Sequence, residues 1–306
     1  MSAWLKQLST GRKVLLGFVL LILLCTIVSR LFPSAGENNE YKPQNEFKLD
    51  PWISLKLGPI DLSINKAVMY LFIAAALTTW VMVYIAKRMQ ERPNNIQTAM
   101  ETAYDLTFNN ITRGNMDPGM AAKWFPVVAA LFFFIIFSNF IGYLPLPTNT
   151  EHKVEILGAH VPALALYAAT ANISVPLVLT LFVWFSYNIE GIRAKGVVPY
   201  FKSWIPAGTP PAMKIPIFAI EAISHFVRII SLSVRLFANI LAGHLLILFM
   251  AGGMVVLLGV AAIGPVTLIA AILFFLFELG IVAGLQAFIF ATLTSIYLGG
   301  ATGEAH

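Results

Sequence analysis

Long apolar runs alternate with short polar segments along this chain. A helix needs about 20 mostly apolar residues to cross the hydrocarbon of a bilayer. Six runs qualify: Val14–Phe32, Ile64–Ala86, Trp124–Leu146, Pro162–Ile189, Ile215–Met250 and Met254–Leu298. The last two exceed one bilayer thickness, so they must tilt, bend or break. A turn between them is predicted by Gly252, Gly253, Gly259, Gly264 and Pro265. The pattern predicts an all-α fold: a polytopic transmembrane helix bundle with a five-span core, an extra N-terminal helix, and a long tilted hairpin over 215–298.

The first run has two interpretations. Basic residues precede Val14–Val28, which is the arrangement of a signal peptide. The following Pro33-Ser34-Ala35 is a poor cleavage site, so we interpret 1–32 as a retained anchor helix, with a cleaved leader as the alternative. The polar segment 33–63 is expected to be an external loop, and 64–306 the transmembrane domain.

The basic residues predict the orientation of the spans. Cytoplasmic loops of membrane proteins carry an excess of Lys and Arg. With the amino end inside, the cytoplasmic segments hold Lys6, Arg12, Lys13, Lys87, Arg88, Arg92, Arg113, Lys123, Arg193, Lys195, Lys202 and Lys214. The opposite side holds Lys153, and the lysines between 30 and 66 are balanced by acidic residues. Six spans then place the carboxyl end inside as well.

One segment, Pro93–Gly114, is amphipathic and is not a span. Its apolar face consists of Ile96, Met100, Ala103, Tyr104 and Ile111, and its polar face of Glu101, Asp105 and Asn109. This pattern predicts a helix lying in the cytoplasmic interface of the membrane. The alternative is a solvated helix that packs on nothing.

Composition narrows the function classes. The chain is 58% hydrophobic and 11% charged, too little charge to cover a soluble surface. The net charge of +5 is spread over short loops, so no nucleic-acid partner is predicted. The single cysteine, Cys25, excludes a disulfide within the chain, and no nucleotide-binding or zinc motif occurs. We therefore expect no cofactor, no metal and no catalytic residue.

Ionisable groups within the apolar run 215–250 mark the candidate site. Such groups are costly in a bilayer, at about 2.5–3.5 kcal/mol each, and usually serve a function. The run carries Glu221, His225, Arg228, Arg235, Asn239 and His244. At about 100° per residue, all but His244 share a stripe roughly 80° wide. This stripe indicates a seam that faces water or protein.

Each polar group also has a structural interpretation. Glu221 and His225 are one turn apart and would pair with each other or with Arg228, which would otherwise reach the interface. Arg235 keeps its proton, so it is either paired within the chain, for example to Glu278, or acts on a partner's carboxylate.

The other runs carry fewer polar residues. In the last run, Glu278 either exchanges protons near neutral pH or partners Arg235 or His244; Gln286 is the other strong polar group. A stripe of small residues there predicts close helix packing: Gly280, Gly284, Ala287 and Ala291. In earlier runs, Asn139 and Asn172 are expected to bond between helices.

Two motifs resemble a known family. The stretch from Ser233 to His244, SVRLFANILAGH, and the stretch from Leu285 to Phe290, LQAFIF, followed by SIYL, resemble the a subunit of F-type ATP synthase. The resemblance covers the chain from about Asp50 to its end and is specific in combination. It implies a non-catalytic membrane subunit that translocates protons, in a bacterial inner membrane, with the c-subunit ring and the b subunits of the peripheral stalk as partners.

The resemblance also implies roles for single residues. Arg235 matches the family's arginine, which faces the carboxylate of a rotating ring, and Asn239 matches the asparagine one turn further on. Glu221 matches an acidic position of the proton path. His244 stands at a position that is Glu or His in relatives, Gln286 matches the glutamine of the last helix, and Asn139 matches a polar position of the inlet half-channel.

The chain departs from the family pattern near Glu278. Many relatives carry an acidic residue or His seven residues before the glutamine, where this chain has Leu279. Glu278 precedes Gln286 by eight residues, and about 100° of helical rotation separates Glu278 from the position of Leu279. The role of Glu278 is therefore an open question at the level of sequence. The N-terminal run Val14–Phe32 is extra to the five-span core of several relatives.

The expected mechanism uses two offset half-channels. Protons enter near Asn139, His244 and Glu278, load the ring, and leave near Glu221 and His225, while Arg235 favours release and blocks direct passage. Two other classes of protein compete with this hypothesis. A proton-coupled secondary transporter typically shows internal repeats, which are not visible here. A membrane scaffold would tolerate loss of the Arg235 charge.

Overall fold

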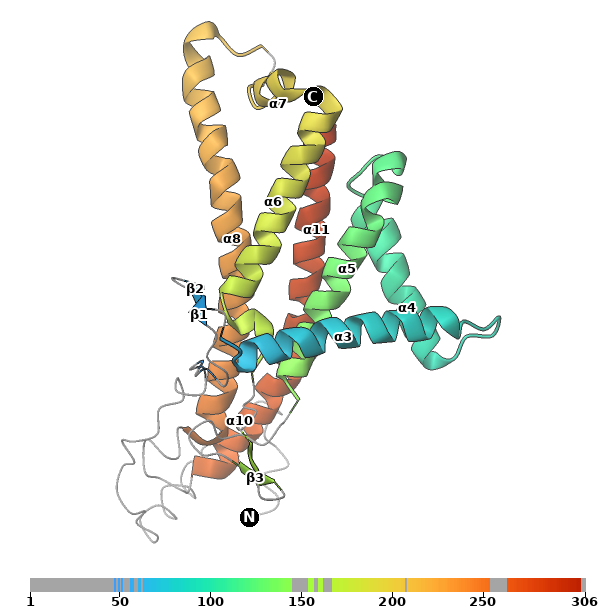
Figure 1. The fold of residues 1–306 in the computed structure, drawn as a ribbon, viewed down its shortest axis with the longest axis vertical. Helices are drawn as coiled ribbons and strands as arrows, with labels where there is room; N and C mark the ends of the chain where they lie inside the picture. Colours follow the sequence, from blue (N-terminus) through green and yellow to red (C-terminus); the bar gives the residue numbers. More distant parts are fainter. Residues whose placement is uncertain are drawn as a thin grey trace, which may run out of the picture. The chain divides into compact units, whose positions relative to one another are not determined.

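The computed structural model describes residues 47, 49, 51, 56–57, 60–61, 63–144, 154–156, 159–161, 167–206, 208–253 and 263–303. The chain divides into two compact units. The larger comprises residues 47–242 and 277–306, and the smaller comprises residues 1–46 and 243–276. The predicted anchor helix 1–32 and most of the predicted external loop 33–63 lie outside the described residues. Figure 1 shows the elements, which are almost all helical.

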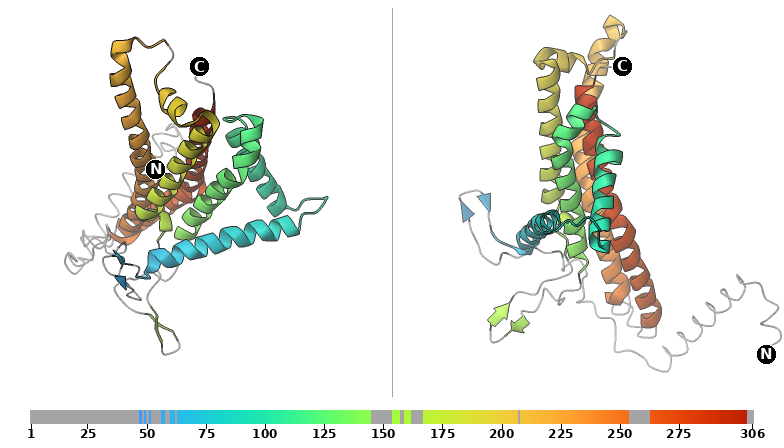
Figure 2. Two further views of the ribbon diagram at one scale, coloured as in Figure 1. Left: turned by 45° about the horizontal axis from the view of Figure 1, so that its top comes forward. Right: turned by 90° about the vertical axis from the view of Figure 1, so that its right-hand side faces the viewer.

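Helix α3 (Lys66–Lys87) opens the larger unit. It begins where the Asn65 side chain accepts a hydrogen bond from the Val68 backbone N–H at 3.1 Å, a helix cap of the usual kind. Its buried side, which includes Tyr70 and Ala74, packs against α5 (Pro118–Gly142). The two further views in Figure 2 confirm that α3 lies across α5 at a steep angle.

The predicted amphipathic helix begins as an α-helix and ends as a π-helix. It consists of α4 (Asn95–Asp105) and the π-helical turn η2 (Leu106–Thr112). Ile111 is buried against the rest of the unit, whereas Ile96 and Tyr104 are exposed, at 68% and 48%. The predicted apolar face is therefore divided, because the π turn rotates the end of the segment towards α5 and α11 (Ala283–Thr302).

The core of the larger unit lies between α5, α11 and α6 (Ser174–Lys195). Aromatic and branched side chains fill it, among them Phe132, Ile135 and Phe290. The 3₁₀ turn η3 (Ala169–Ala171) and the short helix α7 (Val197–Lys202) flank α6. Thus α6 begins twelve residues later than the apolar run that starts at Pro162.

The long C-terminal runs form continuous helices where they are described. Helix η4 (Pro211–Met213) leads into α8 (Lys214–Leu248), which continues as the π turn η5 (Phe249–Gly253). Helix α10 (Gly264–Phe277) continues through the π turn η7 (Glu278–Val282) into α11. Gly252 and Gly253 end η5 and Gly264 begins α10, so the predicted turn around Gly259 lies outside the described residues.

Two small antiparallel hairpins are the strands that the described residues contain. The strand β1 (Lys56–Leu57) pairs with β2 (Ile60–Asp61), and β3 (Val154–Ile156) pairs with β4 (Ala159–Val161). In the first, Lys56 lies opposite Asp61, and in the second, Glu155 lies opposite His160. The first hairpin precedes α3 and the second lies between α5 and α6, so the all-α assignment holds for the described residues.

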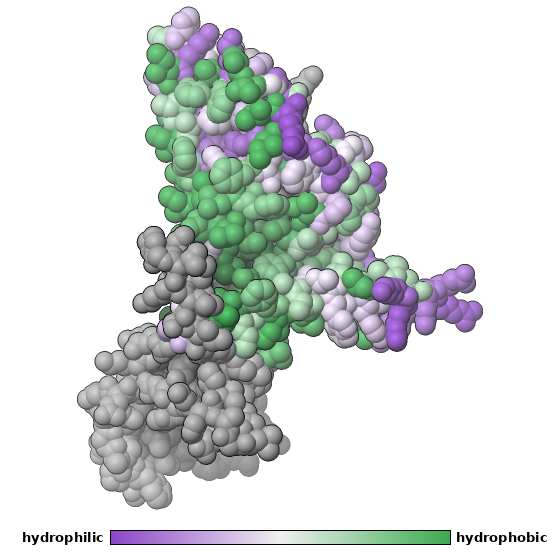
Figure 3. Space-filling view, in the orientation of Figure 1, coloured by the Kyte–Doolittle hydropathy of each residue, from purple (hydrophilic) through white to green (hydrophobic). Residues whose placement is uncertain are grey.

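Five helices among the described residues are long and apolar enough to cross a membrane: Lys66–Lys87, Pro118–Gly142, Ser174–Lys195, Pro211–Gly252 and Val266–Thr302. They correspond to the five predicted core runs. Figure 3 shows a broad hydrophobic surface over the helices, with hydrophilic residues gathered near the ends. Exposed apolar side chains such as Ile223 and Ile230 on α8, 62% and 63% exposed, suit contact with lipid or with another membrane protein.

Two packing predictions are wrong in part. Ala287 and Ala291 are buried as expected, but a Cβ placed on Gly280 or Gly284 would meet nothing within 4 Å. Among the described residues, those two glycines therefore make no close helix contact. Asn172 does not bond to a neighbouring helix: its side-chain oxygen accepts from the Ser174 backbone N–H at 3.0 Å, at the start of α6.

Candidate functional site

Arg235 lies on an exposed face of α8. Its Nη2 atom is 3.4 Å from the Ser231 hydroxyl, one turn earlier, and within the described part of the chain it takes part in no ion pair. Asn239, one turn further on, is also exposed, whereas Leu236 and Ile240 on the opposite side are buried. The guanidinium is thus presented outward from α8, which favours a partner outside the chain over an internal pair with Glu278.

A first polar cluster lies nearer the start of α8. Arg228 donates to Oε1 of Glu221 at 3.2 Å, and Nε2 of His225 lies 3.7 Å from the same oxygen. The Tyr187 hydroxyl, on α6, is 2.8 Å from Nδ1 of His225. The Arg228 guanidinium also lies over the ring of Tyr297, 5.1 Å from its centroid. The cluster therefore joins α8 to both α6 and α11.

Trp204 covers this cluster from the segment that follows α7. Its ring stacks on His225 with centroids 4.1 Å apart and planes 16° apart. Within α7, the Tyr200 hydroxyl donates to the Asn188 side-chain oxygen on α6 at 2.8 Å, and burial raises the pKa of Tyr200. The phenol therefore stays neutral at physiological pH and keeps its hydrogen bond to Asn188.

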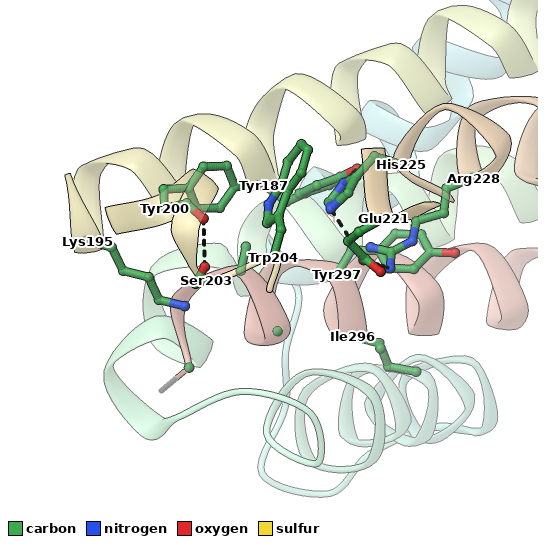
Figure 4. A pocket seen from close by; sticks show the side chains of 13 residues that line it. Tyr187, Lys195, Tyr200, Ser203, Trp204, Glu221, His225, Arg228, Ile296 and Tyr297 are labelled. Atoms are coloured by element: carbon green, nitrogen blue, oxygen red, sulfur yellow. Dashed lines mark hydrogen bonds and ion pairs between the residues drawn. The ribbon is translucent and has the colours of Figure 1, made fainter. Parts of the chain in front are cut away.

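A cavity of about 410 Å³ opens beside these groups. Figure 4 shows His225, Glu221 and Arg228 on one side of it and Tyr200 and Ser203 on the other. Lys195 also lines it. The charged and hydroxyl-bearing side chains among its lining residues suit water and a passing proton.

A second polar cluster lies where α5 ends. The Asn139 side chain donates to the Ala283 backbone oxygen at 3.3 Å and accepts from the Thr170 hydroxyl at 2.7 Å. The Tyr143 hydroxyl, one turn further on, donates to Oε2 of Glu278 at 3.0 Å. This cluster joins α5 to η3, η7 and α11, and it confirms that Asn139 bonds between helices.

Arg235 stands between the two clusters along the helices. In the larger unit, α8 and α11 run in opposite directions (Figures 1 and 2). From Tyr297 to Ala283 the chain covers fourteen residues, about 21 Å along an α-helix. From Arg228, at the level of Tyr297, to Arg235 it covers seven residues, about 10 Å in the same direction. Arg235 is thus about midway.

Most predicted site residues fall into this arrangement. Glu221, His225 and Arg228 form the first cluster, Asn139 and Glu278 the second, and Arg235 and Asn239 the exposed face between them. Gln286, one turn after Ala283 on α11, is buried at 5% exposure. His244 lies in the smaller unit, so its place in the path stays a prediction.

Several residues of the clusters were not predicted. Tyr143 follows Asn139 by four residues, so helical spacing places it on the same side of the chain. Its contact with Glu278 was not predicted. Thr170, Tyr187 and Tyr297 each look like ordinary residues of an apolar segment. Trp204 lies in a segment without a periodic pattern, and its position over His225 depends on tertiary packing.

A metal site has no support in the part of the chain that is described. No three His, Cys, Asp or Glu side chains there come together in a way that would hold an ion. The ionisable groups instead bond to Tyr and Arg side chains.

The fold and the site define a polytopic helical membrane protein with ionisable groups placed along apolar helices. Residues 68–299 match the sequence profile of the family described as ATP synthase A chain, and the chain belongs to this family.

Curated relatives support the assignment over nearly their whole length. The chain is 35% identical over 248 residues to ATP synthase subunit a of Rubrobacter xylanophilus, covering 80% of this chain and 87% of the relative. It is 32% identical over 274 residues to the subunit a of Hyphomonas neptunium, covering 86% and 97%. It is 34% identical over 273 residues to that of Frankia alni, covering 87% of each.

Proposed function

We propose that this chain is the stationary, proton-translocating a subunit of an F-type ATP synthase in a bacterial cell membrane. It is a non-catalytic subunit, and it works with the rest of the complex. Its rotating partner is the ring of c subunits, and the b subunits of the peripheral stalk hold it in place. Membership of the ATP synthase A chain family supports this proposal over a secondary transporter or a scaffold.

The observation that carries the mechanism is the exposed Arg235 between two separate polar clusters. A cation that keeps its proton stands on an outward face of α8 with no ion pair among the described residues. Its natural counterpart is a carboxylate on a protein that packs against that face. Each cluster then serves as a half-channel to one side of the membrane.

Protons load the ring through the half-channel at the end of α5. Asn139, Glu278 and Gln286 belong to it, and His244 is proposed to join them. A ring carboxylate that takes up a proton here becomes neutral and can turn through lipid, because a neutral group enters hydrocarbon at lower cost than a charged one. The driving energy is about 2.3 kcal/mol per charge per 100 mV.

Protons leave through the first cluster. When the ring carboxylate returns to Arg235 from the other side, the nearby positive charge favours its ionised form and hence proton release. Glu221 and His225 then accept the proton beside the cavity and pass it to the aqueous side. The fixed charge of Arg235 also repels a proton that would cross directly, so passage requires rotation.

Replacing Arg235 tests the proposal. In membrane vesicles that contain the complete ATP synthase, we expect Arg235→Ala to abolish ATP synthesis driven by an imposed proton gradient, with the complex assembled in normal amounts. Arg193→Ala is the matched control, since the Arg193 side chain is 69% exposed at the end of α6. Native synthesis rates in the Arg235→Ala vesicles would falsify the role of this charge.

A further inference from the structure

A π-helical turn separates the two strong polar groups of the last helical segment. Glu278 and Gln286 are eight residues apart, and on an unbroken α-helix they would point about 80° away from each other. The π turn η7, Glu278–Val282, lies between α10 and α11. A π turn accommodates about one extra residue and so removes about 100° of rotation. Glu278 and Gln286 are thereby brought to within about 20° of one direction.

The contacts of Glu278 agree with this rotation. Glu278 is 9% exposed and Gln286 is 5% exposed, so both side chains point into the protein. Oε2 of Glu278 accepts the hydrogen bond of the Tyr143 hydroxyl at 3.0 Å. Four residues before Tyr143 on the same side of α5, Asn139 bonds to the Ala283 backbone directly after the π turn. α5 and the residue that follows it therefore bond to the π turn at both of its ends.

We infer that the π turn aims Glu278 into the half-channel and that Tyr143 is a positioning residue that holds its carboxylate there. This inference rests on the proposed function. It adds to it a positioning role for Tyr143, which follows α5, and a role for the π turn η7 in directing Glu278. It also answers the open question about Glu278. Its carboxylate lies one residue earlier in the chain than the acidic residue or His of many relatives, and the extra residue of the π turn compensates for this shift.

The chemistry requires only one proton at a time. Glu278 takes up a proton from the aqueous side; its O–H bond then breaks as an O–H bond forms on the acceptor carboxylate of the ring, which leaves Glu278 ionised for the next cycle. The Tyr143 hydroxyl donates to the ionised carboxylate and accepts from the protonated one. It can therefore hold the same side chain in both states.

Moving the carboxylate by one position tests the role of the π turn. The double variant Glu278→Leu, Leu279→Glu keeps the composition and rotates the carboxylate by about 100°. In vesicles with the assembled enzyme, we expect its ATP-driven proton pumping to fall about tenfold, as in Glu278→Gln. Leu279→Glu alone, which keeps Glu278, is the control and is expected to pump at nearly the native rate.

The role of Tyr143 is tested by a double-mutant cycle. Tyr143→Phe keeps the ring and removes the hydroxyl, and we expect it to slow pumping several-fold. If the hydroxyl acts through Glu278, the same change has no further effect in the Glu278→Gln background. An equal loss in both backgrounds would assign Tyr143 a packing role and overturn the inference.

Native pumping by the double variant at 278 and 279 would overturn the role of the π turn. The Arg235→Ala variant separates the two proposals. If it is inactive while the Glu278 and Tyr143 variants pump normally, the proposed function stands and this inference fails. If Arg235→Ala is itself active, the proposed function fails first.

Discussion

Glu190 shows how a single acidic residue joins two helices at the edge of the apolar core. Its side chain is 6% exposed, and both carboxylate oxygens lie 2.8 Å from Nζ of Lys123, near the start of α5. Arg193, one turn later on α6, reaches Oε1 at 3.2 Å. Because Glu190 is nearly buried, it depends on these donors in place of water.

Loss of Lys123 should therefore destabilise the protein more than loss of Arg193. We expect Lys123→Met to lower the stability by about 1–3 kcal/mol, because it leaves a nearly buried carboxylate short of its two closest hydrogen bonds. Arg193→Met is expected to cost less, since Arg193 makes one longer contact. The measurement is the heat-induced aggregation midpoint of this chain in the complex purified in detergent. Equal midpoints for the two variants would contradict the assignment.

Single residues also show what the sequence could predict about the site. The stripe on α8 predicted the contacts among Glu221, His225 and Arg228, because spacings of three, four and seven residues bring side chains together on one helix. The partners Tyr187 and Trp204 come from other elements. Their positions follow from how α6 and the segment after α7 pack on α8, which no local pattern encodes.

At the scale of elements, α11 approaches the segment after α4 very closely. A Cβ on Gly299 would overlap the Asn115 backbone oxygen, whereas a Cβ on the neighbouring Gly300 would meet nothing within 4 Å. One turn earlier, the Ser295 hydroxyl donates to the Ile111 backbone oxygen at 3.0 Å. The absence of a side chain at 299 is what allows α11 to lie against this backbone.

The two glycines form a matched pair for a test. We expect Gly299→Ala to destabilise the protein by about 1–3 kcal/mol, because the added methyl forces α11 away from Asn115. Gly300→Ala is expected to be neutral or slightly stabilising, since alanine is the better helix former. The same aggregation midpoint, with the yield of assembled complex, distinguishes them. A native midpoint for Gly299→Ala would show that this contact can relax.

The elements themselves were largely predictable, while their irregularities were not. Length and hydropathy predicted the five core helices, because crossing a bilayer demands long apolar runs. The π turn η7 left no signal in the apolar pattern, since one extra residue in a helix that is apolar all round changes no periodicity that can be read. For this reason the direction of Glu278 could be found only from the structure.

At the scale of the whole molecule, the exposed face of α8 predicts where the proposed rotating partner lies. In a chain with Cys25→Ser, we expect Ala238→Cys, which is exposed near Arg235, to form a disulfide with cysteines introduced into the outer helices of the c ring. Ile240→Cys, on the fully buried side, is the control and should not cross-link. Products are resolved by non-reducing electrophoresis. Cross-linking from 240 but not from 238 would place the ring elsewhere.

The steep crossing of α3 over α5 has a consequence for the surrounding lipid. Helices that cross in this way cannot all stand along the bilayer normal, so either α3 or α5 lies strongly inclined. An inclined helix no longer matches the acyl chains by its length, and the nearest lipids must stretch, compress or tilt to cover it. The enzyme should therefore respond to membrane thickness, with turnover in reconstituted vesicles varying with the chain length of the phospholipid.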